Sequence, residues 1–344
     1  MNVLVTGGAG FFGSMLAGKL QRRGDRVRVF DVNRLDEPTG EIETIKADIR
    51  DLDAVKSAFD GVEVVHHNVA QVPLAKDRHL FDSVNRGGTR NVLEAARHTG
   101  VRKVIYTSSS AVFGVPRDNP VTEQTPPTPM EAYGRAKYDG ELLCREYADE
   151  HGVDVTIIRP RTIMGHGRLG IFQILFEWIR SGDNVPVFGK GDNVYQFVHA
   201  EDLADACILA GERPGATIYN CGTDRYNTMR EVLEDLCHHA NTGSKVRSVP
   251  MTPAVLGMKL TSALGLSPLG PYHSLMYGRS LYFDISKAKE ELSWQPTRSN
   301  TEMFIESYEW YLEHRDEVLA AKSGGSAHRS AVKHGVLGMV RKVL

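Results

Sequence analysis

A tyrosine and a lysine stand four residues apart in the segment YGRAK, as Tyr133 and Lys137. The surrounding residues 131–152 predict a long helix, and positions i and i+4 of a helix share one face. An ammonium group beside a phenol lowers the pKa of the phenol from about 10. A phenolate tuned in this way can take the proton of an alcohol while a hydride leaves the same carbon. The pair therefore predicts acid/base catalysis of alcohol oxidation or of the reverse ketone reduction.

Three serines, Ser108 to Ser110, follow a predicted strand that begins at Lys103. In open α/β sheets, ligands bind beyond the carboxyl ends of the parallel strands. A serine hydroxyl at that end can therefore hydrogen-bond the substrate oxygen that reacts with Tyr133. The spacing YxxxK is common by chance, and the serines upstream make the catalytic interpretation more specific.

The segment TGGAGFFG has glycines at 7, 10 and 13, between a predicted strand and a predicted helix. Such glycines permit a tight turn and a close backbone approach to a pyrophosphate, and the helix N-terminus supplies N–H donors. Asp31 ends the second predicted strand about twenty residues later, where a carboxylate binds an adenosine ribose and repels a 2′-phosphate. The pattern predicts NAD rather than NADP, although Arg34 could pair with the extra phosphate. A glycine turn without a ligand is the alternative.

The elements that position these residues alternate between strand and helix along residues 1–160, which predicts a parallel sheet covered on both faces. After Pro160 the pattern loosens. We therefore expect an α/β protein with a Rossmann-type doubly wound parallel sheet in residues 1–160, to which residues 197–221 return. We expect a smaller mixed α/β substrate lobe in residues 161–196 and 222–320, and a flexible basic amphipathic tail in residues 321–344.

Composition limits the functional class. The 344 residues carry a formal net charge of -2, which gives no electrostatic reason to expect binding to nucleic acid. No apolar run approaches the ~20 residues of a membrane span, and the first residues have the pattern of a strand rather than of a signal segment. The four cysteines show no CxxC spacing, and the adjacent histidine pairs lack the spacing of metal ligands. We expect a cytoplasmic protein without a metal site.

The motifs occur in a recognisable order: GxxGxxG, Asp31, VNRGGTRNV, SSSAVFG, YxxxK, IIRP, FVHAEDLADA and ELSWQP. In this order they resemble extended short-chain dehydrogenases/reductases, the epimerase/dehydratase superfamily, over about residues 1–315. The resemblance implies that Tyr133 is the acid/base and that Lys137 binds the nicotinamide ribose while tuning Tyr133. The catalytic serine of this superfamily lies five residues before the glycine of a VYG motif; that glycine is here Gly114, which selects Ser109.

The same resemblance implies the cofactor contacts. Asp48 and Ile49, after a third predicted strand, could border the adenine, and Asp48 could also cap the helix predicted at 51–60. Asn85 resembles the asparagine of the central helix, and Pro160 resembles the proline beside the nicotinamide. The expected cofactor-binding residues are Gly7, Gly10, Phe11, Phe12, Gly13, Asp31, Asp48, Ile49, Ala70, Asn85, Tyr133, Lys137 and Pro160.

The reactions of the superfamily differ in their accessory residues. The resembling sugar 4,6-dehydratases have Thr-Asp-Glu where this chain has Ser109-Ser110-Ala111, which disfavours dehydration. The resembling 4-epimerases hold a pyrophosphate with an asparagine and two arginines, whose positions here are Arg161-Thr162, Tyr195-Gln196 and the vicinity of Ser274. Burying a pyrophosphate requires charge-assisted donors. Three other arginines could substitute: Arg161, Arg168 and Arg279. The expected substrate-binding residues are Ser110, Arg161, Tyr195 and Arg279.

The branch that fits these departures resembles 3β-hydroxysteroid dehydrogenases and sterol 4-carboxylate 3-dehydrogenases, through the segments IIRPRTIMGHG, GKGDNVYQFVHAEDLADACILA and LYFDISKAKEELSWQP. In these enzymes NAD oxidises a ring alcohol, and an adjacent carboxylate can leave as CO₂. The resemblance implies an apolar ring alcohol as the small-molecule substrate. A nucleotide-sugar 4-epimerase is the alternative, and an inactive NAD-binding sensor is a remote third reading.

Three further features have two interpretations each. The apolar segment IFQILFEWI, residues 171–179, could line a pocket for a lipid-like substrate or could be the core of the small lobe. The tail could contact an anionic membrane surface, or could be a frayed end or a helix that docks on a partner. The resemblance also implies a homodimer formed through the helices near residues 84–99 and 132–150.

Overall fold

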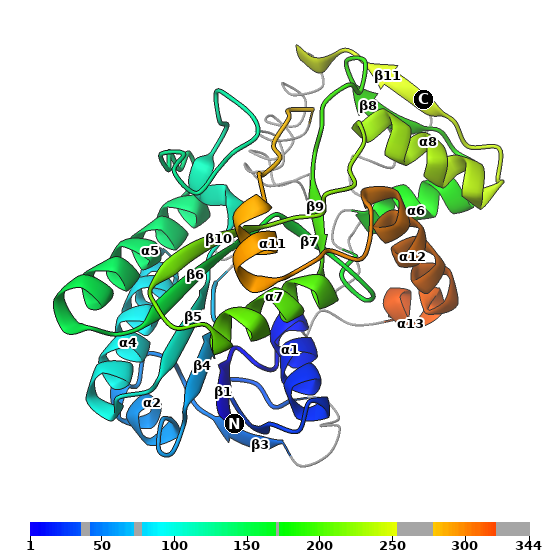
Figure 1. Ribbon diagram of the computed structural model, residues 1–344. Helices are drawn as coiled ribbons and strands as arrows, with labels where there is room; N and C mark the ends of the chain where they lie inside the picture. Colours follow the sequence, from blue (N-terminus) through cyan, green and yellow to red (C-terminus); the bar gives the residue numbers. More distant parts are fainter. Residues whose placement is uncertain (36–41, 72–77, 170–171, 253–277, 321–344) are drawn as a thin grey trace.

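The computed structural model describes residues 1–35, 42–71, 78–169, 172–252 and 278–320. A seven-stranded sheet runs through its larger part in the order β10-β6-β5-β4-β1-β2-β3, and every neighbouring pair is parallel (Figure 1). This sheet confirms the predicted Rossmann-type fold. Its strands are β1 (Asn2–Thr6), β2 (Arg26–Asp31), β3 (Glu43–Lys46), β4 (Val64–His67), β5 (Lys103–Thr107), β6 (Val155–Pro160) and β10 (Thr217–Cys221).

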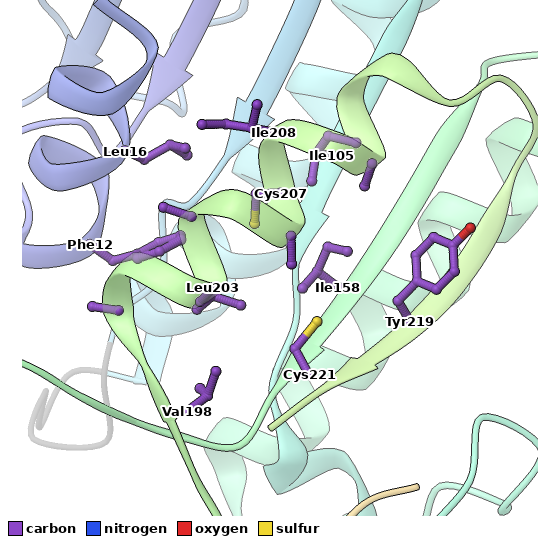
Figure 2. Packing of buried hydrophobic residues seen from close by; sticks show 14 of the residues in the cluster. Phe12, Leu16, Ile105, Ile158, Val198, Leu203, Cys207, Ile208, Tyr219 and Cys221 are labelled. Carbon is purple, nitrogen blue, oxygen red and sulfur yellow. The ribbon is translucent and has the colours of Figure 1, made fainter. Parts of the chain in front are cut away.

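The central strands are apolar because both faces of the sheet are covered. Every residue of β4, β5 and β6 is buried, whereas the edge strand β3 is polar and mostly exposed. One face is covered by α1 (Phe11–Arg22), α7 (Ala200–Glu212) and α11 (Ser286–Leu292), and the other by α2 (Leu52–Ala58), α4 (Gly88–Thr99) and α5 (Ala132–His151). Figure 2 shows the first face, where Leu203 and Cys207 of α7 lie over Ile105 and Ile158.

The strand order reverses at β1, which pairs with β2 on one side and with β4 on the other. In doubly wound sheets the chain leaves such a pair of strands in opposite directions and opens a ligand-binding crevice at their carboxyl ends. The loop after β4 is followed by the short helices α3 (Arg78–Asp82) and η1 (Ser83–Gly87), and β5 is followed by η2 (Ser110–Phe113). The predicted chemistry-bearing residues therefore lie at one end of the sheet.

A second cluster of elements has its own core (Figure 1). It contains α6 (Phe172–Arg180), β8 (Val185–Phe188), α8 (Met229–Ala240), β11 (Val246–Val249), α12 (Asn300–Glu313) and α13 (Arg315–Ala320). The side chains of Ile174, Phe176 and Trp178 are buried in this core. Of the two interpretations of the apolar segment, the structure favours the lobe core over a pocket wall.

Strand β9 (Phe197–His199) pairs with β7 (Thr162–Met164) and not with the main sheet. Tyr195 instead bridges to Leu281. Of the returning segment 197–221, only β10 joins the main sheet. The predicted domain division remains a prediction.

The basic tail at 321–344 and Ser274 lie outside the described residues, so the membrane contact of the tail stays a prediction, as does the homodimer. Within the described ranges, none of the helices is both long enough and apolar enough to cross a membrane.

One buried ion pair ties α5 to the sheet. Arg159 of β6 donates from Nε and Nη2 to the two carboxylate oxygens of Glu141 on α5, at 2.8 and 2.6 Å, and both side chains have no exposed surface. Ser108, directly after β5, donates to the same carboxylate at 2.6 Å. Helix α5 is thereby fixed to two strands at once.

We expect Glu141→Leu to lower the free energy of unfolding by about 3–5 kcal/mol, because it leaves the Arg159 guanidinium buried without a counter-charge. The double variant Glu141→Leu/Arg159→Met should recover part of this loss, because it removes both charges. Urea unfolding followed by tryptophan fluorescence measures both values. A single variant as stable as the parent would contradict a structural role for the pair.

Candidate active site

The glycine loop forms a cradle at the start of α1. Gly7 has a φ of 71°, in the left-handed region, and a side chain there would press on the backbone of Asn68 and Val69 after β4. A Cβ on Gly13 would lie 2.1 Å from the carbonyl oxygen of Gly7. Helix α1 has no side-chain cap, so its first backbone N–H groups remain for a ligand. This cradle fits a pyrophosphate.

Asp31 lies beside this cradle. Its carboxylate accepts from the backbone N–H of Ala9 at 3.1 Å and of Asn33 at 2.9 Å. The carboxylate is therefore held at the end of β2, where a ribose hydroxyl would reach it and a 2′-phosphate would be repelled. The arrangement fits NAD.

The other expected cofactor residues surround the crevice in different ways. The side chain of Asn85 is buried and binds the backbone of Gln71 through N–H···O contacts of 2.8 and 3.4 Å, which fixes the loop that contains Ala70. Asp48 pairs with Arg50, whose hydrogen bonds lower the pKa of that carboxyl group. The side chains of Phe11, Phe12, Ile49 and Pro160 are buried.

Ser109 acts on the Tyr133 phenol. A hydrogen bond from the Ser109 side chain lowers the pKa of that phenol. Ser109 also caps η2, because its Oγ accepts from the backbone N–H of Ala111 at 3.2 Å. Tyr133 lies in the first turn of α5, whose N-cap is Glu131: the Glu131 carboxylate accepts from the N–H groups of Tyr133 and Gly134 at 2.7 and 2.6 Å. Ser109 is thus fixed at the start of η2, and the backbone of Tyr133 is fixed at the start of α5.

Burial is the largest cause of the shift in the pKa of the Tyr133 phenol, which is raised. Part of the side chain remains exposed. Ser109 and Arg168 oppose this rise, while Glu131 adds to it. Arg168 follows β7, and its guanidinium lies 5.6 Å from the ring centre of Phe11. An arginine from the loop after β7 therefore opposes the effect of burial on the pKa of the phenol.

Lys137 lies one turn after Tyr133 and is buried. Its ammonium donates to the backbone oxygen of Thr107 at 2.7 Å and lies 5.1 Å from the ring centre of Tyr106. Burial lowers the pKa of Lys137 to about 8. Ser109 and Arg168 lower the pKa of Tyr133, and the tuning of the phenol by Lys137 stays a prediction.

The expected substrate residues divide into a cluster and an outlier. The Arg161 guanidinium donates to Ser110 Oγ at 2.7 Å and lies 4.5 Å from the ring centre of Tyr195. The hydroxyl groups of Tyr195 and Thr162 hydrogen-bond at 2.9 Å. Arg279 is exposed. Two of the positions where the resembling epimerases hold a pyrophosphate therefore contact each other.

Residues 3–222 match the NAD dependent epimerase/dehydratase family. The chain belongs to this family. It is 52% identical, over 98% of its length and 85% of the relative, to the uncharacterized protein y4nG of Sinorhizobium fredii. It is 30% identical to a UDP-glucose 4-epimerase of Mycolicibacterium smegmatis, over 90% of this chain and 98% of the relative.

Two other similarities concern different substrates. The chain is 29% identical to a 3 beta-hydroxysteroid dehydrogenase/Delta 5-->4-isomerase of Mycobacterium tuberculosis, over 90% of each chain. The crystal structure of a UDP-glucose 4-epimerase of Thermotoga maritima with UDP-glucose superposes with a TM-score of 0.76 at 26% identity, over 92% of this chain and 100% of that chain. The protein is therefore an NAD-dependent enzyme of the extended short-chain dehydrogenase/reductase type, and the family includes both nucleotide-sugar and steroid enzymes.

For this family member, sequence reasoning gave no role to two side chains near the site, Glu131 and Glu141, and gave a different role to a third, Arg168. Glu131 is missed because glutamate is not among the preferred N-caps. Glu141 lies four residues after Lys137, so helical spacing could have placed it on the catalytic face. Arg168 had been considered only as a phosphate-binding residue. Its relation to Tyr133 depends on how the loop after β7 folds back, which local pattern does not reveal.

We expect Gly13→Ala to weaken NAD binding by at least about tenfold, equivalent to about 1.4 kcal/mol. The reason is the Cβ that would meet Gly7, which must displace the glycine loop. Gly87→Ala is the matched control, because a Cβ there has nothing within 4 Å and the backbone is helical. Titration calorimetry with NAD measures the affinities. Equal affinity of the two variants would contradict the proposed cradle.

Proposed function

We propose that this enzyme oxidises a secondary alcohol on a ring to a ketone with NAD, in the manner of a 3β-hydroxysteroid dehydrogenase. The observation that carries the proposal is the hydrogen bond between Tyr195 and Thr162. It engages two positions at which a pyrophosphate-binding relative would need free donors. The 29% identity to the mycobacterial steroid dehydrogenase supports the same substrate class.

In the proposed reaction, Tyr133 acts as the base. Its phenolate takes the hydroxyl proton of the alcohol as the carbon–oxygen double bond forms, and Ser109 donates a hydrogen bond to the same oxygen. When bound, NAD accepts the hydride that leaves the carbinol carbon. The products are the ketone, NADH and a proton on Tyr133, and the reverse reaction uses the phenol as the acid. Ser109 would hand its hydrogen bond from the phenol to the substrate.

The residues that fit the cofactor have separate proposed roles. The N-terminus of α1 and the glycines before it would hold the pyrophosphate, and Asp31 would hold the adenosine ribose. Lys137 would bind the nicotinamide ribose, with Thr107 keeping its ammonium at the end of β5. Burial of Lys137 between α5 and the sheet excludes water from this charge.

A nucleotide-sugar 4-epimerase is the second candidate. The M. smegmatis relative and the T. maritima structure with UDP-glucose support it. The same Tyr133, Ser109 and Lys137 could serve this reaction, because an epimerase oxidises the alcohol, turns the ketone and reduces it again. The two candidates differ in their net product, since only the dehydrogenase accumulates NADH.

We expect purified enzyme with NAD and a 3β-hydroxysterol to form NADH, and Tyr133→Phe to lower the rate by about 10²–10⁴-fold while NAD binding is retained. UDP-glucose and UDP-galactose form the second arm, analysed by product mass and chromatography. Sugar interconversion without NADH would favour the epimerase. A fully active Tyr133→Phe would remove Tyr133 from the acid/base role.

A second prediction concerns pH. The phenol must lose its proton to act as the base, and its pKa is raised by burial, so oxidation should accelerate as pH rises above neutrality. Arg168→Gln removes a cation that lowers this pKa. We therefore expect this variant to form NADH more slowly at each pH, and the increase of its rate with pH to occur at higher pH. Initial NADH formation measures the profile.

Arg168→Lys retains the charge and is the matched control for this profile. Lys137 is common to all variants, and the loss of its proton near pH 8 affects each of them alike. A profile of Arg168→Gln that coincides with the parent profile would show that Arg168 does not act on the phenol.

A further inference from the structure

Among the residues that the structure describes, Arg161 is a buried cation without a counter-charge. It follows β6 directly, and its side chain is 1% exposed. Within the described part of the chain, Nη1 donates to Ser110 Oγ at 2.7 Å, whereas Nε and Nη2 are buried and have no hydrogen-bond partner. The rings of Tyr195 and Phe283 lie 4.5 and 5.6 Å from the guanidinium carbon. These ring faces attract the charge but offer no acceptor to the unused N–H groups.

Arg159 provides an internal comparison. It lies two residues earlier, within β6, is also almost fully buried, and donates from Nε and Nη2 to Glu141. A buried guanidinium is normally paired in this way, because desolvation of an unpaired charge is costly. The fold therefore supplies a carboxylate to Arg159 and, in the described residues, none to Arg161.

Arg161 is connected to the reaction centre through Ser110. Ser110, which binds Arg161, is adjacent in sequence to Ser109, which binds the Tyr133 phenol. Arg168 acts on the same phenol and likewise has no carboxylate partner among the described residues. A planar guanidinium with two free N–H groups matches the geometry of a carboxylate. A pyrophosphate in a nucleotide sugar is several bonds from the reacting carbon, so proximity to Ser109 favours a group on the reacting ring itself.

We propose that Arg161 binds a carboxylate that the substrate carries on the carbon next to the reacting alcohol, so that the substrate is a β-hydroxy acid. The inference rests on the proposed function, because Ser109 and Tyr133 mark the reacting carbon. Nε and Nη2 have almost no exposed surface, so the carboxylate reaches them as the Tyr195 ring turns off the guanidinium. The hydrogen bond between Tyr195 and Thr162 breaks in the same movement.

The test measures binding without turnover, in the NAD-loaded Tyr133→Phe protein. Two matched pairs serve as probes: UDP-glucuronate against UDP-glucose, and a 4-carboxy-3β-hydroxysterol against the sterol without the carboxyl group. Each pair differs beside the reacting alcohol in whether a carboxylate is present. We expect at least one acid to bind about tenfold more tightly than its neutral partner, because a charge-assisted contact is gained.

Arg161→Met in the same background should bring this acid-to-neutral ratio to about one, and Arg161→Lys should restore part of it. Arg135→Met is the matched control: Arg135 is exposed, lies two residues after Tyr133 on α5, and its loss removes an equal charge without touching Ser110. Its ratio should equal that of the Tyr133→Phe parent. Urea unfolding of each variant shows that the fold is retained.

The outcomes separate the inference from the proposed function. Equal binding within each pair, an Arg161→Met ratio equal to that of the parent, or no binding of either acid would overturn the role of Arg161. NADH formation from the neutral sterol together with equal binding would leave the proposed function standing alone. An acid preference that requires Arg161, without NADH from either sterol in the Tyr133 enzyme, would support the inference and count against the dehydrogenase.

Discussion

The buried pair between Arg159 and Glu141 fixes the relative positions of the groups that are proposed to do chemistry. Ser109 follows β5, Arg161 follows β6, and Tyr133 with Lys137 lies on α5. Both charged groups are desolvated, and this cost offsets much of the stability that their attraction provides. Its bidentate geometry, with Ser108 on the same carboxylate, instead specifies one position of α5 along the strands. A shift of α5 by one turn would separate the phenol from Ser109.

Two arginines near the end of β6 have different surroundings. Arg159 lies within the strand and reaches Glu141, whereas Arg161 directly follows the strand. The second meets a serine hydroxyl and aromatic faces. Together with Arg168 and the buried Lys137, it adds positive charge around the proposed site, which favours an anionic substrate. Of these cations, Arg168 lowers the pKa of the phenol.

The sheet, the glycine cradle and the Tyr133 helix could be predicted because each depends on local periodicity and chain order. The choice of Ser109 came from spacing to Gly114, and the structure brings it into contact with Tyr133. Contacts between distant segments could not be predicted. Thr107 binds the ammonium of Lys137, Arg168 lowers the pKa of the phenol from the loop after β7, and Arg161 has no carboxylate partner among the described residues. Each of these features depends on how remote loops fold back.

The substrate question therefore depends on charge rather than on apolar surface. The apolar helix α6 is explained by the core of the small lobe, so its composition no longer favours a lipid-like substrate. The contact between Tyr195 and Thr162 disfavours a pyrophosphate at those positions, but this contact and the stacking of Tyr195 on Arg161 can break together. A carboxylate beside the reacting carbon is compatible with a sterol acid and with a sugar acid. A carboxylate bound by Arg161 would therefore specify the group next to the reacting alcohol. It would not by itself distinguish the steroid branch from the nucleotide-sugar branch of the family.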